Sequence, residues 1–134
     1  KMNQLRHVRF FTDAAGVKAH MQKHSALLRP KFAAVDEIFE RELGGTGLAT
    51  WTKPRGGYFV SLDTLDGCAT EVVRLADEAG VKLTPAGATF PLGKDPRNRN
   101  IRVAPSLPPA SQVQTAMEVV ALCVKLASAR KLAG

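Results

Sequence analysis

Apolar residues recur at helical spacing along the first third of the chain. Leu5, Val8 and Phe11 lie three residues apart and predict a short amphipathic helix over residues 3–11. A longer helix is predicted to follow up to residue 43, because apolar residues continue at intervals of three, four or seven: Val17, Met21, Leu28, Phe32, Val35, Phe39 and Leu43. Thr12-Asp13 can cap its start, and Gly44-Gly45 can end it. Pro30 lies inside this pattern and predicts a kink rather than an end.

Short β-prone runs occupy the middle of the chain. Residues 48–51 and 58–62 flank the turn-forming run Pro54-Arg55-Gly56-Gly57, which predicts a β-hairpin. Residues 81–84 and 101–104 are two further short strand candidates. Trp51 and Phe59 suggest that part of the second face of the sheet is covered.

Two more helices complete the predicted elements, one over residues 68–79 and one from Pro108-Pro109 to about residue 132. The last helix carries a stripe of apolar residues: Val113, Met117, Val120 and Val124. The element order α-α-β-β-α-β-β-α predicts an α+β fold. We expect a two-layer sandwich in which long helices cover a small sheet of three or four strands.

Composition allows one domain with a real core and gives no transmembrane helix, since no apolar run approaches the roughly 20 residues that span a bilayer. Cys68 and Cys123 belong to no metal-binding or redox pair, so reduced, buried thiols of a cytoplasmic protein are expected. His20 and His24 have a metal-ligand spacing, but without a third ligand nearby no metal site is predicted. The net charge of +7 is spread along the chain. Its densest cluster, residues 94–100, has the composition of a solvated loop.

Three motifs, in order along the chain, resemble one enzyme family. The run Lys53–Asp63 resembles the P-x-G-G-[MY]-F-x-x-[LW] segment of fold-type I, class I/II aminotransferases, which depend on pyridoxal phosphate (PLP). Residues 81–90 resemble the family's v-x-v-x-P-G-x-x-F strand and loop, with Ala86 inserted between the Pro and the Gly. Residues 100–106 resemble its iR-[lvi]-x-x-[sa] strand. Each motif alone is weak, but together, at family spacing and with helices in the gaps, they cover essentially the whole chain.

The resemblance implies the C-terminal small domain of an aminotransferase, with residues 1–12 as the end of the large domain or a connecting helix and residues 13–134 as the small domain. The Schiff-base lysine and the PLP-binding residues are then expected upstream, so no catalytic or cofactor-binding residue is assigned here. The chain alone is expected to be inactive. The implied parent is a cytoplasmic homodimer that transfers an amino group, with aspartate as the expected donor, to a 2-oxo acid such as 2-oxoglutarate.

Arg102 is the residue that we expect to touch substrate. Strand alternation sends Ile101 and Val103 to one face of the sheet and Arg102 to the other. A guanidinium offers two parallel N–H donors that match a carboxylate, and the resemblance implies that Arg102 binds the α-carboxylate. Gly57 is a weaker candidate for close backbone approach to a ligand, and Phe90 is a weaker candidate for a residue that closes over substrate.

Two other interpretations stay open at this point. Residues 3–11 and 105–109 most resemble the bacterial, especially actinobacterial, aspartate aminotransferase subgroup related to MocR-type enzymes. A PLP-sensing domain of a MocR-type transcription regulator would share this region. A basic nucleic-acid-binding module would account for the positive charge, although no stripe of aromatic and basic residues favours it.

Overall fold

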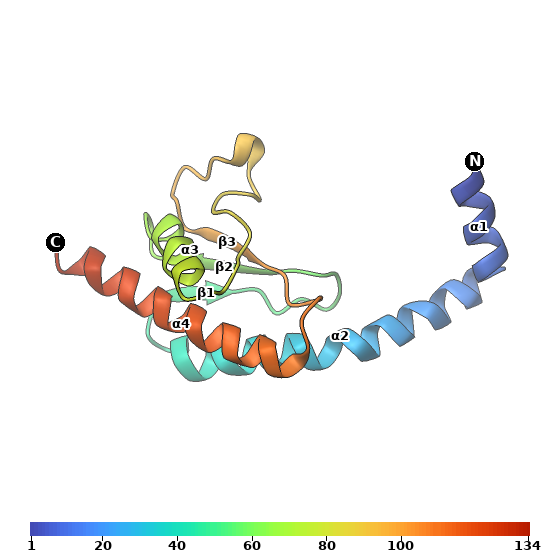
Figure 1. Ribbon diagram of the computed structural model, residues 1–134, viewed down its shortest axis with the longest axis horizontal. Helices are drawn as coiled ribbons and strands as arrows, with labels where there is room; N and C mark the ends of the chain where they lie inside the picture. Colours follow the sequence, from blue (N-terminus) through green and yellow to red (C-terminus); the bar gives the residue numbers. More distant parts are fainter. The chain divides into compact units, whose positions relative to one another are not determined.

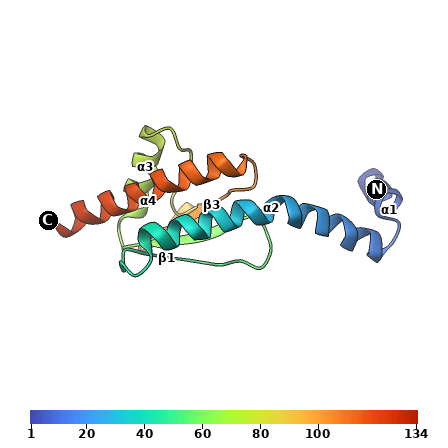
Figure 2. The same ribbon diagram turned by 90° about the horizontal axis from the view of Figure 1, so that it is seen from below.

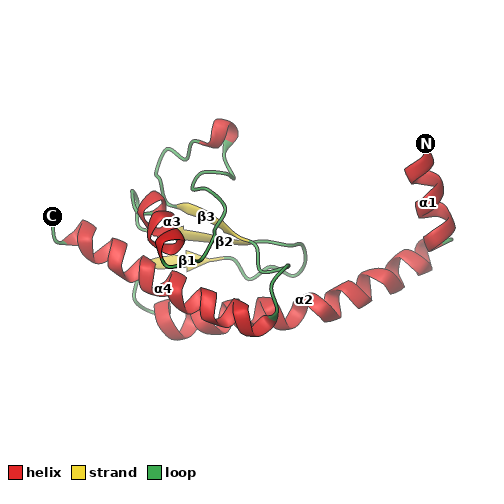
Figure 3. Ribbon diagram, viewed as in Figure 1, coloured by secondary structure: helices red, strands yellow, loops and turns green.

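The computed structural model describes residues 1–134, which divide into two compact units, residues 1–30 and 31–134. Helices, strands and loops are distinguished in Figure 3. The first unit contains α1 (Met2–Phe11) and the start of α2 (Ala14–Leu43). As predicted, α2 does not end at Pro30.

In the first unit, a tight turn joins the two helices. Thr12 has a left-handed backbone with φ of 65°, and the Asp13 carboxylate accepts a hydrogen bond of 2.8 Å from the Gly16 N–H, as expected of a helix cap. Phe10 and Phe11 at the end of α1 pack edge-on against His20 of α2. No residue of α1 is buried, so the apolar pattern of residues 3–11 forms a helix without forming a core.

The second unit is built on a three-stranded antiparallel sheet in the order β1-β2-β3. The predicted hairpin is formed by β1 (Ala49–Trp51) and β2 (Val60–Thr64), and β3 (Asn100–Val103) pairs with the other edge of β2. In this register Trp51 lies opposite Leu62, and Leu62 lies opposite Ile101. Trp51 therefore faces the core, where it packs against Phe39, and does not cover the second face as the sequence suggested.

Helices cover one face of this sheet. The part of α2 after Pro30 and α4 (Ala110–Leu132) lie side by side against it, and the two ribbon views agree on this arrangement (Figures 1 and 2). The ion pairs Arg41–Glu118 and Lys125–Glu42 join the two helices. α3 (Ala69–Glu78) packs on α4. The predicted α+β two-layer sandwich is confirmed.

The core is a single cluster of apolar side chains between the sheet and the helices. Val60 and Leu62 of β2 and Ile101 and Val103 of β3 are almost completely buried, and the predicted stripe of α4 is buried with them. Along α2, by contrast, the apolar pattern is buried only from Ala34 onward. Both cysteines are free and buried, as predicted.

One predicted strand is wrong: Val81–Thr84 forms no strand. The Val81 N–H donates back to the Ala76 carbonyl, which completes the end of α3. The next proline, Pro85, has no N–H to offer a ladder. Only at Gly87 does the chain reach β3, with a long N–H···O contact of 3.4 Å to Asn100. The segment is therefore a loop, which continues through the 3-10 turn η1 (Pro91–Gly93) to β3.

Candidate functional site

The face of the sheet that points away from the helices is polar. Alternation along β2 and β3 places Ser61, Asp63, Asn100 and Arg102 on this face, since the residues between them point into the core. The loop that carries η1 rises on this side of the sheet, opposite α2 and α4 (Figure 1). We call these four residues the polar face.

Arg102 is the unpaired cation of the polar face. Its position lies directly across from Ser61 in the β2–β3 register. Its Nε is buried and has no hydrogen-bond partner within the chain. A buried guanidinium N–H without an acceptor is costly, and such an orphan in a folded protein calls for a partner from outside. The geometry suits a planar anion that accepts hydrogen bonds from the guanidinium.

An aromatic ring packs against one face of the Arg102 guanidinium. The guanidinium carbon lies 4.6 Å from the centre of the Phe59 ring, which is the distance of a cation–π contact. Because this stacking covers a face of the guanidinium, its N–H groups at the edge are left for a ligand. The alternation of Tyr58 and Phe59 along the strand predicts that one ring enters the core and the other lines the wall of the cleft, without deciding which. The available signal was alternation, since Phe59, Ser61 and Asp63 are two residues apart and share a face.

The aromatic pair before β2 departs from the prediction that one ring enters the core. Tyr58 is 53% exposed and Phe59 is 48% exposed. Both residues precede the first strand residue, Val60, which is the one that is buried. The core therefore begins one residue later than the apolar run suggests.

Asn100 organises the rest of the polar face. Its buried amide donates to Ser61 Oγ at 2.8 Å and to Asp63 Oδ1 at 2.7 Å, and its Oδ1 accepts from Thr89 Oγ1 at 2.5 Å. The amide thus ties β2 to β3 and ties both to the loop before η1. Because Arg102 follows Asn100 by two residues on the same strand, this network fixes the strand that carries it.

Asp63 accepts hydrogen bonds from Arg99 and Asn100 and forms none with Arg102. Its Oδ2 accepts from Arg99 at 2.6 Å, and its Oδ1 accepts from Asn100. Partial burial alone would raise the pKa of this carboxyl, but the hydrogen bonds from Asn100 and Arg99 outweigh burial and hold the pKa below its ordinary value. Asp63 is therefore ionised at neutral pH and committed to Arg99.

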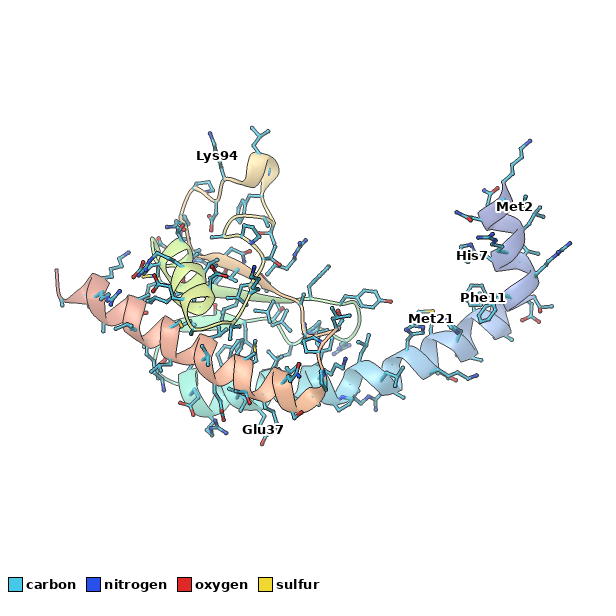
Figure 4. All side chains as sticks on the ribbon, in the orientation of Figure 1. Met2, His7, Phe11, Met21, Glu37 and Lys94 are labelled. Carbon is cyan, nitrogen blue, oxygen red and sulfur yellow. The ribbon has the colours of Figure 1, made fainter.

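The basic cluster at residues 94–100 is an ordered, internally paired loop. The Asp95 carboxylate accepts hydrogen bonds from the backbone N–H groups of Arg97, Arg99 and Asn100. Arg97 pairs with Asp66, so both arginines of the cluster face carboxylates. Lys94 projects away from the domain (Figure 4). This pairing removes most of the positive charge that a nucleic-acid-binding surface would need at this loop.

Gly57 and Phe90 are the weaker site candidates, and neither has the structural signature that Arg102 has. Gly57 has a left-handed backbone with φ of 89°, and a Cβ there would meet no atom within 4 Å. Its conformation alone favours glycine, so close approach to another group is not needed to explain it. Phe90 precedes η1 and is 37% exposed, so it is not a core residue.

No helix is long and apolar enough to cross a membrane. No cluster of three or more His, Cys, Asp or Glu side chains has the arrangement of a metal site. His20 and His24 lie one helical turn apart in the first unit with their Nε2 atoms at 3.0 Å.

The site is thus a polar sheet face, backed by helices, whose arginine has a buried Nε without a partner in the chain. The family model described as aspartate aminotransferase matches residues 1–134. The chain belongs to the aspartate aminotransferase family.

Relatives support the same assignment. The aspartate aminotransferase of Corynebacterium glutamicum is 53% identical over 133 residues, which make up 99% of this chain and 31% of that protein. A crystal structure of an aspartate transaminase from C. glutamicum ATCC 13032 is 53% identical, with a TM-score of 0.93 over 96% of this chain and 30% of that one. The chain thus spans less than a third of the length of these relatives.

A more distant structure shows the fold alone. The α-aminoadipate aminotransferase of Thermus thermophilus is 20% identical, with a TM-score of 0.72 over 85% of this chain and 28% of that one. The predicted small-domain fold is therefore confirmed. The relation to MocR-type enzymes stays a prediction.

Proposed function

We propose that this chain is the substrate-carboxylate-binding part of a pyridoxal-phosphate-dependent aminotransferase. The reaction would transfer the amino group of an amino acid, aspartate in our proposal, to a 2-oxo acid such as 2-oxoglutarate. The observation that carries the proposal is the buried, unpartnered Nε of Arg102 on the polar face. Membership of the aspartate aminotransferase family supports the reaction class.

Arg102 would bind the α-carboxylate of the amino acid and, in the reverse half-reaction, that of the 2-oxo acid. Two parallel N–H donors fix the angle of a carboxylate as well as its position. Phe59 limits rotation of the guanidinium by stacking on it. A substrate anchored in this way presents its Cα–H bond in one orientation, so the contact contributes to the rate as well as to binding.

Pyridoxal phosphate supplies the electron sink for this class of reaction. The neighbouring α-aminoadipate aminotransferase was solved as a complex with N-(5'-phosphopyridoxyl)-L-leucine, which supports the same cofactor here. The orphaned Arg102 fits the carboxylate of the substrate, and we assign no residue of this chain to the cofactor or to proton transfer. On this proposal the chain alone is inactive.

The proposed domain division follows the same logic. Residues 1–12 would belong to the end of the large domain or to a connecting helix, and residues 13–134 to the small domain. Exposed apolar side chains on α1, among them Met2 and Phe10, support a role for this helix as a contact with further protein. The full-length protein would act in the cytoplasm as a homodimer with its own large domain completing the site.

The test is the substitution Arg102→Ala in the full-length protein. We expect kcat/KM for aspartate to fall roughly 150-fold, because a buried charged pair is lost. This fall corresponds to about 3 kcal/mol of lost transition-state stabilisation. The absorbance of bound pyridoxal phosphate should be unchanged, because Arg102 is not a cofactor ligand in this proposal. Arg102→Lys should recover only part of the loss, since an ammonium cannot form the two-pronged contact.

Arg130→Ala is the matched control. Arg130 lies on α4, pairs with Glu71 of the neighbouring helix α3, and is not part of the polar face. Its removal should leave kcat/KM within about twofold of the wild type, since exposed pairs contribute little. Near-normal transamination by Arg102→Ala would remove Arg102 from the site.

A further inference from the structure

A histidine pair in the first unit has no role in the proposed reaction. All three histidines of the chain, His7, His20 and His24, belong to residues 1–30. His20 and His24 are four residues apart on α2, and their Nε2 atoms approach to 3.0 Å with the ring centres 4.5 Å apart. His24 is exposed and His20 is half-buried. The two Nε2 atoms therefore lie within hydrogen-bond distance of each other at the helix surface.

Two imidazole nitrogens at this distance either share one proton or bind one cation. Sharing a proton uses one N–H and one lone pair, whereas in a metal complex both lone pairs point at the ion. A metal–imidazole bond is about 2.0–2.1 Å long. With the Nε2 atoms 3.0 Å apart, a shared ion would see an N–metal–N angle of about 95°.

This angle is closer to the geometry that some metals prefer than to that of others. A tetrahedral ion such as Zn²⁺ needs about 109°, for which the two nitrogens would have to be about 3.3 Å apart. An angle near 90° is that of neighbouring ligands in octahedral or square-planar complexes, which Ni²⁺ and Cu²⁺ prefer. Imidazole is also a preferred ligand of both ions.

We propose that His20 and His24 form a bidentate chelate for Cu²⁺ or Ni²⁺. Aromatic contacts hold the His20 ring in place, since the Phe10 and Phe11 rings pack edge-on against it at 5.3 Å. A fixed ring loses less freedom when the ion binds. A metal bridge between residues four apart also clamps one turn of α2, because both ligands must keep their helical spacing.

The surroundings set the strength of the site. Arg6 and Arg9 line the hollow beside His20 together with His7, Phe10 and Phe11. Their positive charges oppose a cation, and no carboxylate completes a cluster of three ligands. Water therefore fills the remaining coordination positions, and the site has moderate affinity. Figure 4 shows His7 and Phe11 on α1 and Met21 on α2, next in sequence to His20.

The experiment is calorimetric titration of the full-length protein with Ni²⁺, repeated with Cu²⁺ under electron paramagnetic resonance. We expect one site that disappears, or weakens on the order of tenfold or more, in both His20→Ala and His24→Ala, because the second ligand of a chelate binds intramolecularly. His7→Ala is the first control and should bind as the wild type does. The Cu²⁺ spectrum should show two equivalent nitrogen ligands in the wild type.

The second control keeps the number of histidines and breaks their spacing. The double substitution Met21→His and His24→Ala places the two rings at adjacent positions, which point to different sides of a helix. This variant should lose the site as fully as His24→Ala alone. Equal binding by the wild type and His24→Ala, or by the wild type and the displaced pair, would overturn the chelate. So would equal losses in His7→Ala, or no binding by the wild type.

Discussion

At the scale of single residues, Arg102 is the position where sequence and structure agree most closely. Alternation between Ile101 and Val103 predicts that Arg102 leaves the core, and the structure places it on the polar face. The sequence could not show that the guanidinium lacks an acceptor, since that depends on Asp63 being taken by Arg99 and Asn100. Phe59 could not be told apart from Tyr58 for a related reason. Its contact with Arg102 depends on where β2 begins, and strand ends are poorly marked by composition.

Phe59 gives a prediction at this scale. Phe59→Leu in the full-length protein keeps an apolar side chain but removes the π face under the Arg102 guanidinium. We expect kcat/KM for aspartate to fall about two- to fivefold, the effect of losing about 0.5–1 kcal/mol of cation–π attraction at a partly exposed site. Phe59→Tyr keeps the ring and should match the wild type. Steady-state kinetics with both variants would decide, and equal values for Leu and Phe would exclude a positioning role for the ring.

At the scale of elements, the helices and the hairpin follow from the sequence, whereas the segment between α3 and β3 does not. The stripe of α4 specifies a buried face, and Pro-Arg-Gly-Gly specifies a turn, so local chemistry is sufficient there. Val81–Thr84 has the composition of a strand, but a strand also needs a partner ladder. The Val81 N–H closes the end of α3, and Pro85 has no N–H to offer. Pairing depends on neighbours distant in sequence, so composition alone could not settle it.

The link between β2 and the loop before β3 makes stability depend on pH. The hydrogen bonds from Asn100 and Arg99 outweigh burial and lower the pKa of Asp63 in the folded state. A carboxyl with a lowered folded pKa stabilises the fold above its unfolded pKa, and this gain is lost as the pH falls through the folded value. Asp63→Asn should therefore cost less than about 1 kcal/mol at pH 7, given the exposure of the pair.

The difference between the wild type and Asp63→Asn should shrink steadily below about pH 4, where the ordinary carboxyl takes up its proton, and should vanish once Asp63 itself is protonated. Urea unfolding of both proteins between about pH 7 and pH 2.5 measures this directly. Asp77→Asn is a suitable control, since Asp77 forms no ion pair in the structure and should give no such trend. A constant difference at all pH values would contradict the assigned role of the Asp63 carboxylate.

At the scale of the whole molecule, apolar residues at helical spacing occur in two units that differ in burial. The apolar pattern predicts one helix over residues 3–11 and a second helix up to residue 43, and both helices form. The burial of these helices does not follow the pattern, because no residue before Ala34 is buried and the core lies entirely within residues 31–134. Periodicity reports which side of a helix is apolar, but it does not report what covers that side. The relatives are about three times as long as this chain, and we propose that the rest of the full-length protein covers the apolar side of α1.

The two units predict how a shortened chain will behave. Removing residues 1–30 takes away no buried side chain, so the free energy of unfolding in urea should change by less than about 1 kcal/mol. The slope of that transition should also be nearly unchanged, because it scales with the surface buried on folding. The far-ultraviolet helix signal, by contrast, should fall, because most of residues 2–30 are helical. Ile38→Ala in the shortened chain is the positive control, since this buried side chain should cost about 2–5 kcal/mol. A large loss of stability on removing residues 1–30 alone would mean that they contribute to the fold of residues 31–134.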